Sequence, residues 1–570
     1  MHVTNPAHAP PFDAIIIGSG LGGLVAGALL AQGGKRVQLL ERHDKFGGAA
    51  TTFRRRDLQV EVSLCVMDGL DPHDFKTPLF AKLGLLDAVP VATADPFFCL
   101  RHPLLGSDFV MPRGYDAAIA ACSERFPQHA KSIRTYFNTI RHLRNLRNQT
   151  LIHHFTTGNT PLSDLAHIQA TLTGADPEAT PPPLPTQHRD ALSSAQKISM
   201  SRFMQTLFGD DEAIRFALCA NLPFFTSTLD HISLFDFSLS QGSYHYGAHY
   251  VRQGSQKLSD RLVGIIREAG GEVHARREVT SILMDQGRAV GVTHRKAPII
   301  GSSKPVSQSD PQESHARLIL GNATPRVIRG LLPEPWREPF HRPYDNIPAD
   351  LSNWTIYLGF SRPPSHYGVR HYAHFVYPSW LDSMKKMPES CTLMGLPPGS
   401  REAPFLFCDY SQLGEMIGEN GQCLGLMNWI DRLSNWQFPN EAAYQAHKQA
   451  WLAAMIDSLD RTFPGIRESI VYQEMATPRT VQSYLNDPLG GVHGFGDPEL
   501  MKLNPSFHRG CMTAVDGLLL ATSFAFGPGY SKAILTGTVA ADNAFKALRR
   551  QPIHTPSPSP SHPTQGRVHD

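Results

Sequence analysis

The sequence has 570 residues, of which 41% are hydrophobic, and its formal net charge is +2. This length allows two large interleaved domains, and the apolar content supports a buried core. The near-neutral charge gives no electrostatic basis for binding nucleic acid, so we expect no such partner.

Cysteine and histidine spacing argues against a metal site. The eight cysteines are scattered without a C-x-x-C pair, which predicts neither a zinc site nor a disulfide framework and favours a reducing cytoplasm. The 27 histidines show no H-E-x-x-H or comparable ligand spacing. We therefore predict no bound metal.

The first apolar stretch, "DAIIIGSGLGGLVAGALLAQGGKRVQLLERHDKFGG", occupies residues 13–48. No Lys or Arg precedes it, which argues against a secretory signal. Its centre is crowded with glycine, which weakens a membrane-spanning helix. Neither membrane interpretation explains the stretch.

A nucleotide site explains the stretch better. Residues 14–17 read as a strand buried on both faces, and residues 24–32 read as a helix. Between them lies G-x-G-x-x-G, whose glycines permit a tight turn, close approach of a pyrophosphate and close helix packing. The helix start offers free N–H groups to phosphates. The predicted cradle consists of Gly18, Gly20, Gly22 and Gly23.

A second strand, "RVQLLE", ends at Glu41, whose carboxylate is placed to accept hydrogen bonds from the hydroxyls of an adenosine ribose. The same carboxylate disfavours a 2′-phosphate, because two negative groups would meet in a partly dry site. NAD and FAD both remain possible from these residues.

The residues after Glu41 carry a resemblance to a known family. Arg42 follows the acid, and the paired Gly47 and Gly48 come after a short spacer. This pattern resembles the FAD-dependent superfamily of phytoene desaturases, carotenoid isomerases and retinol saturases. The resemblance implies FAD as the cofactor.

The resemblance returns in separate later segments. Residues 253–292 read as a helix, a strand and a hairpin, and the resemblance places the backbone at Val279 against the adenine. "ARLILGNATP", residues 316–325, is similar to the strand and turn that return to the FAD domain, and Asn322 in it is assigned to the cofactor.

The last block, residues 516–548, reads as a buried strand, a turn and a helix with small residues on its packed side. The positive end of that helix would face its ligand, which the resemblance identifies as the flavin ring. Gly529, Tyr530 and Ser531 are the predicted contacts. Earlier in the chain, Glu61 stands near the place where relatives carry an acid, and Ser63 replaces a glycine.

The predicted fold class is α/β, with a Rossmann-type FAD-binding domain of the glutathione-reductase-like or amine-oxidase-like kind interleaved with a mixed-sheet and helical substrate domain. We predict that the FAD domain is built from residues 12–95, 241–330 and 479–548. The substrate domain would comprise a helical lid, 96–240, and a sheet, 331–478, and residues 549–570 would form a disordered tail. Two loops, at 174–188 and 301–314, are low in complexity.

A flavin beside an apolar cavity can take a hydride from a saturated carbon or return one to a double bond. The resemblance implies a carotenoid desaturase type of FAD oxidoreductase, acting on a long polyene or isoprenoid. A cis-trans isomerase, a saturase using reduced FAD, a more distant amine-oxidising relative, and a flavin-binding protein without turnover remain alternatives. "GSYHYGAHY" supplies His245 and Tyr246 as candidates for orienting substrate or moving a proton, although packing roles would also explain them.

One segment hints at a membrane. Residues 129–150 combine Lys131 and four arginines with apolar residues near helical spacing. A basic amphipathic helix of this kind can lie on an anionic membrane, while a solvated helix of a lid is the plainer interpretation. We expect a cytoplasmic protein with a lipophilic small-molecule partner and at most peripheral membrane contact.

Overall fold

The computed structural model describes residues 12–176, 186–299, 311–344, 351–492 and 511–550. The predicted tail from residue 551 onward and much of the two loops lie outside these ranges, while residues 549–550 of that tail end the last helix. The last three residues of the second loop are not loop, because β13 begins at Gln312.

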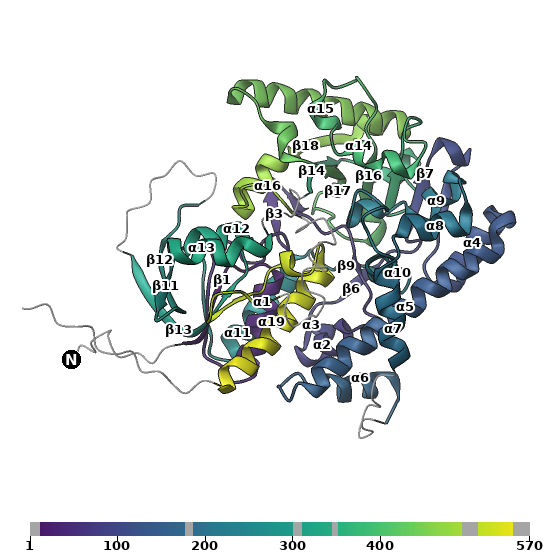
Figure 1. Cartoon of the computed structure of the whole chain (residues 1–570). Coiled ribbons are helices and arrows are strands. Elements are labelled where there is room, and N and C mark those ends of the chain that lie inside the picture. Colours follow the sequence, from purple (N-terminus) through teal and green to yellow (C-terminus); the bar gives the residue numbers. More distant parts are fainter. Residues whose placement is uncertain (1–11, 177–185, 300–310, 345–350, 493–510, 551–570) are drawn as a thin grey trace, which may run out of the picture.

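A first sheet of seven strands draws its strands from three distant parts of the chain (Figure 1). Its order is β10-β2-β1-β13-β12-β11, and β19 also pairs with β13. The pairs of β1 with β2 and with β13 are parallel, which suits the unbroken apolar run of β1. The strands are β1 (Phe12–Ile17), β2 (Val37–Leu40), β10 (Glu272–His274), β11 (Arg277–Asp285), β12 (Arg288–Lys296), β13 (Gln312–Gly321) and β19 (Leu518–Leu520).

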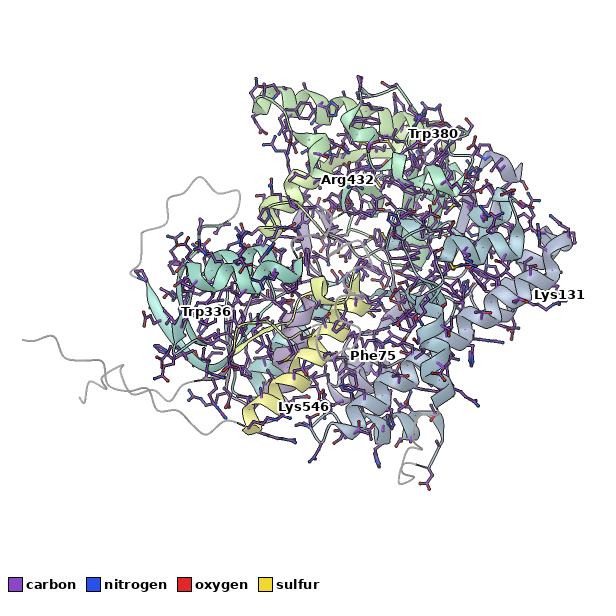
Figure 2. All side chains as sticks on the ribbon, viewed as in Figure 1. Phe75, Lys131, Trp336, Trp380, Arg432 and Lys546 are labelled. Carbon is purple, nitrogen blue, oxygen red and sulfur yellow. The ribbon has the colours of Figure 1, made fainter. Side chains whose placement is uncertain are left out.

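Three helices pack close to this sheet: α1 (Leu21–Gln32), α11 (Gln256–Glu268) and α19 (Tyr530–Arg550). Helix α1 crosses α19 at glycines, since a Cβ added to Gly537 would lie 2.4 Å from the carbonyl oxygen of Gly22. Near the other end of the sheet lie α12 (Pro325–Leu331) and α13 (Glu334–His341) (Figure 1). Trp336, on α13, is labelled there in Figure 2.

A second sheet of seven strands has the order β18-β14-β17-β16-β15-β7-β8. Its pairs are antiparallel except for β15 with β7. The strands are β7 (Phe98–Arg101), β8 (Phe109–Met111), β14 (Ser352–Phe360), β15 (Ala373–Val376), β16 (Phe405–Asp409), β17 (Cys423–Asp431) and β18 (Ile470–Ala476). The long helix α15 (Glu441–Thr462) lies beside this sheet, at the top of Figure 1.

The predicted helical segment 96–240 thus starts with two strands that extend the second sheet. They are short, and their periodicity is too brief to stand out before the helices that follow. The helical group is α4 (Tyr115–Arg125), α5 (Ala130–Thr157), α6 (Leu165–Thr173), α7 (Thr186–Gln196), α8 (Met200–Phe208), α9 (Glu212–Cys219) and α10 (Leu234–Tyr244). It forms the right side of Figure 1, and α2 (Lys76–Lys82) and α3 (Leu85–Ala88) lie at the lower centre of the same view.

Short elements join the sheets to the helical group. They are the hairpin of β3 (Thr52–Arg55) and β4 (Leu58–Glu61), and a small sheet of β5 (Met67–Asp68), β9 (Ala248–Val251) and β6 (Val91–Thr93). Two further short helices are α14 (Met387–Ser390) and α16 (Pro478–Leu485).

Helix α5 does not present its apolar stripe to a membrane. Ile133, Phe137 and Ile140 are fully buried, and the helix packs against α10. Two of its arginines, Arg144 and Arg147, are buried as well, so the basic face expected from the sequence is partly internal. Lys131 lies at the outer end of the helix (Figure 2). Across the described part of the chain, no helix combines the length and apolarity needed to cross a bilayer.

Candidate functional site

A cavity of about 710 Å³ lies where the first sheet, the second sheet and the helical group meet. Its lining includes every residue predicted to bind the cofactor except Gly23. These residues are Gly18, Gly20, Gly22, Glu41, Arg42, Gly47, Gly48, Val279, Asn322, Gly529, Tyr530 and Ser531. The fold therefore gathers segments that are more than 500 residues apart onto one surface.

The glycine loop is held by Asn322, at the end of β13. Its Nδ2 donates to the carbonyl oxygens of Gly18 at 3.3 Å and Gly20 at 3.0 Å. Gly18 has a φ of +93°, which favours glycine. A Cβ on Gly23 would lie 2.7 Å from both Asn322 and the Gly18 carbonyl oxygen, so this glycine serves packing beneath the loop.

The second pair of glycines lies directly against the first loop. The N–H of Gly47 donates to the carbonyl oxygen and to Oγ of Ser19, each at 3.1 Å. A Cβ on Gly48 would lie 3.2 Å from Cα of Gly20. Backbone from both loops thus forms one wall of the cavity, in which Gly18, Gly20, Gly47 and Gly48 carry no side chain.

Glu41 follows β2 at the rim of this wall. Its Oε2 accepts hydrogen bonds from N and Oγ of Ser19 at 2.7 and 2.6 Å, and Oε1 accepts from N of His43 at 2.7 Å. These bonds fix the carboxylate in place. Arg42 instead fastens α16, because its Nη2 donates to the carbonyl oxygens of Ser483 and Tyr484 at 3.1 and 3.0 Å.

The start of α19 reaches the opposite end of the cavity. Gly529 has a φ of +89°, and Tyr530 and Ser531 begin the helix. The hydroxyls of Tyr530 and Ser63 are 3.4 Å apart, and burial raises the pKa of Tyr530, so its hydroxyl keeps its proton. Oγ of Ser531 donates to Oδ1 of Asp68 on β5.

Glu61, which the sequence offered as a substitute acid, is buried and does not line the cavity. Its oxygens accept from the hydroxyl of Tyr250 at 3.0 Å, and from N and Oγ of Ser255 at 2.9 and 2.7 Å. Burial raises its pKa. Glu61 therefore joins β4 to β9 and the start of α11, which is a structural role.

A cluster of buried charges at the α19 end was missed from the sequence. Nζ of Lys76 lies 3.0 Å from Asp74 and 3.6 Å from Asp68, and only 1% of the Lys76 side chain is exposed. Nη2 of Arg144 pairs with Asp74 at 2.7 Å and also with Asp71. Although burial alone would raise the pKa of Asp74, Lys76 and Arg144 hold it below its usual range. Phe75, within this segment, is labelled in Figure 2.

The rest of the lining is largely apolar. It comes from the second sheet and from the turn and helix that face that sheet. The apolar residues are Pro223, Phe224, Phe225, Leu239, Tyr244, Phe375, Leu406, Trp429 and Ile430. Tyr244 stacks on Phe97, with ring centroids 5.2 Å apart. This part of the cavity can hold an elongated apolar molecule.

The two candidate catalytic residues, His245 and Tyr246, do not line the cavity. His245 packs among the rings of Phe97, Tyr115 and Phe137, and burial lowers its pKa to about 4. The hydroxyl of Tyr246 bonds to the side chain of Asn145. The structure thus places both side chains in the packing of the helical group.

Comparisons with known proteins agree with this geometry. Residues 16–81 match the family described as an NAD(P)-binding Rossmann-like domain. The chain is 24% identical to an all-trans-retinol 13,14-reductase of Macaca fascicularis, over 86% of this chain and 78% of that protein. It is also 24% identical to a chloroplastic prolycopene isomerase of Arabidopsis thaliana, over 93% of this chain and 82% of that protein.

Solved structures confirm the predicted fold class. A putrescine oxidase variant superposes with a TM-score of 0.56 at 14% identity, covering 95% of this chain and 99% of that one. Cyclohexylamine oxidase from Brevibacterium oxydans superposes with a TM-score of 0.54 at 14% identity, covering 95% and 100%. The solved structures bear on the fold alone, while the reductase and isomerase relatives confirm the predicted resemblance to carotenoid isomerases and retinol saturases.

Proposed function

We propose that the protein is an FAD-dependent oxidoreductase that acts on a long apolar polyene or isoprenoid. The observation that carries this proposal is that one cavity joins a glycine-built backbone wall to an apolar chamber. The wall suits the phosphates of a dinucleotide, and the chamber suits a hydrocarbon chain.

The residues present fit FAD. The backbone of Gly18, Gly20, Gly47 and Gly48 would receive the pyrophosphate, and Glu41 would receive the ribose hydroxyls. Val279 would lie near the adenine. Two cavity-lining residues at the start of α19, Tyr530 and Ser531, would lie near the flavin ring, where the positive end of the helix favours negative charge.

When bound, FAD would accept a hydride from a saturated carbon or supply one to a double bond. The protein's own work is to orient the substrate along the aromatic wall and to exclude water. Phe375, Leu406 and Trp429 supply that wall from three neighbouring strands.

The proposed function includes three possible reactions, which are desaturation, saturation and cis-trans isomerisation. The reductase and isomerase names of the relatives support saturation or cis-trans isomerisation beside the desaturation expected from the sequence. A flavin-binding protein without turnover is the remaining alternative.

An anaerobic absorbance experiment tests these alternatives. The purified protein is scanned before and after addition of all-trans-retinol or prolycopene in detergent, and the products are analysed. Bleaching of the flavin as the substrate gains double bonds means desaturation. Turnover that requires prior reduction means saturation or isomerisation. Bound flavin that no polyene changes means a protein without turnover.

A cradle variant tests the cofactor assignment. A Cβ on Gly20 would lie 2.9 Å from Nδ2 of Asn322. Gly20→Val therefore displaces the side chain that holds the loop assigned to the pyrophosphate, and we expect a folded protein without flavin. Gly330→Ala is the control, since a Cβ there would meet nothing within 4 Å. Stoichiometric flavin in Gly20→Val would overturn the assignment.

The low solubility of polyenes in water supports a further part of the proposal, a cytoplasmic protein that contacts a membrane peripherally. The buried apolar stripe of α5 is unavailable for that contact. Co-sedimentation with anionic vesicles tests it, and recovery of all protein in the supernatant would contradict it.

A further inference from the structure

Among the described residues, four carboxylates line the cavity, and three of them are committed to neighbours. Glu41 accepts three hydrogen bonds at the glycine end. Glu278 pairs with Arg295 at 3.1 Å. Asp74 is buried between Lys76 and Arg144. Asp68 is the fourth, and among the described residues the only hydrogen bond to its carboxylate is the one from Ser531 to Oδ1.

The second oxygen of Asp68 accepts no hydrogen bond from the described residues. Oδ2 lies 3.6 Å from Nζ of Lys76, which is too long for a hydrogen bond, and 14% of the side chain is exposed. Because Asp68 lines the cavity and bonds to Ser531 at the start of α19, it lies beside the place assigned to the flavin ring.

The backbone after Asp68 adopts an unusual conformation that brings the charges together. Gly69 has a φ of +85° and Leu70 a φ of +61°, and the second is rare for a branched residue. A Cβ on Gly69 would lie 2.1 Å from Oδ2 of Asp74 and 2.8 Å from Nζ of Lys76. The turn therefore lets Asp74 and Lys76 pack directly behind Asp68. Such strain persists where the surroundings impose it, which is common at functional sites.

We propose that Asp68 is the proton-transfer residue of this cavity, and this proposal rests on the proposed function. In saturation, the O–H bond at Oδ2 of protonated Asp68 breaks, and its proton forms a C–H bond with the electron pair of the double bond. The hydride for the other carbon comes from the reduced cofactor, which is oxidised. The carboxylate then regains a proton from water. In desaturation the same carboxylate accepts the proton.

Lys76 acts as a positioning residue. Its ammonium holds the Asp68 side chain on the cavity side and stabilises the carboxylate after the proton has left. Arg144 and Asp74 fix the ammonium in turn, because the three groups share short contacts. Lys532 also lines the cavity, where burial lowers its pKa while Asp236 and Asp68 act to raise it.

The test is Asp68→Asn in the flavin-loaded protein, with all-trans-retinol and prolycopene as probes. The amide keeps the shape and the bond from Ser531 but cannot donate an acidic proton. We expect normal flavin content, substrate binding within about threefold of the natural protein, and a single-turnover rate at least about 100-fold lower. Asp409→Asn is the matched control, because Asp409 is a buried aspartate that does not line the cavity, and it should keep the rate.

A second readout is independent of turnover. The resting flavin spectrum of Asp68→Asn should differ from that of the natural protein, because a charge beside the ring perturbs its absorbance. Asp68→Glu, which keeps a carboxyl group one methylene further out, should restore part of the rate and part of the natural spectrum. It also serves as the test variant if Asp68→Asn fails to fold, and a full natural rate with an unchanged spectrum would then count against the proposal.

The outcomes separate the two proposals. If the natural protein holds no flavin or converts neither probe, the proposed function fails. If the natural protein converts a probe and Asp68→Asn does so within threefold, the assignment of Asp68 fails while the proposed function stands.

Discussion

The two ends of the cavity are built in different ways. At the glycine end, two backbone segments touch with no side chain between them, and Asn322 bonds to peptide oxygens. At the α19 end, five charged or hydroxyl side chains from four separate segments contact one another, and they are Asp68, Asp74, Lys76, Arg144 and Ser531.

The difference predicts different tolerance to mutation. A backbone wall leaves no room for added atoms, so any side chain there is harmful. A cluster of side chains tolerates a substitution that keeps the shape of the side chain. It is destabilised when one charge of a buried pair is removed. Substitutions that add atoms should therefore be harmful at the glycine end. Substitutions that remove a charge should be harmful at the charged end.

The largest expected effect is at Gly22. A Cβ there would lie 1.9 Å from the carbonyl oxygen of Ala521, which is backbone and cannot turn away. We expect Gly22→Ala to destabilise the protein by more than about 5 kcal/mol, so that little folded protein is recovered. Yield and flavin content after purification measure this. Gly330→Ala should leave both unchanged, and normal yield of Gly22→Ala would contradict the packing of α1 on β19.

The next effect is at Lys76. Lys76→Met leaves the carboxylates of Asp68 and Asp74 without their shared ammonium, which should cost about 3 kcal/mol in the free energy of unfolding. Urea denaturation followed by tryptophan fluorescence measures it. Lys82→Met on the same helix is the control, since Lys82 pairs with the half-exposed Asp164 and should cost less than about 1 kcal/mol. Equal costs would mean that the cluster is not sealed from water.

A smaller effect, seen only in acid, is expected at His245. Burial lowers its pKa from 6.5 to about 4, so the unfolded chain takes up a proton at a higher pH than the folded protein does. The free energy of unfolding therefore keeps its full value above pH 6.5 and decreases as the pH falls towards 4. At pH 5 the decrease is about 2 kcal/mol.

His245→Phe, which packs with the same rings, should remove this loss. The unfolding free energy of each protein at pH 5 and pH 7.5 measures it, and the pH 7.5 values serve as the internal control. An acid-dependent loss that is the same in both proteins would show that His245 is not buried in its neutral form.

The glycine end could be predicted from the sequence because its signals are consecutive. Strand, glycines, helix and Glu41 occur within about 30 residues, and each has a local reason. The later segments, such as the one with Asn322, were assigned only through the resemblance.

The charged end could not be predicted, because nothing in residues 68–76 indicates the distant Arg144 and Ser531 that complete the cluster. Nothing near Lys76 or Arg144 indicates that they meet, and helical spacing in α5 suggested a solvated or membrane-facing basic side. Periodicity identifies an apolar stripe on a helix but not the elements that cover it. The burial of Arg144 could therefore be seen only in the three-dimensional structure. The short spacing of Asp68, Asp71 and Asp74 to Lys76 was the only available signal.

Asn322 has a consequence for how the protein is made. Strand β13, which ends at the residue before it, lies between β1 and β12 and pairs in parallel with β1 across about 300 residues of chain. During translation, the glycine loop therefore emerges from the ribosome long before Asn322, which holds it by hydrogen bonds, has been synthesised. The nascent amino-terminal part must wait, with one edge of β1 uncovered, until residue 322 has been synthesised. Cofactor loading should accordingly be a late event in the biogenesis of this protein.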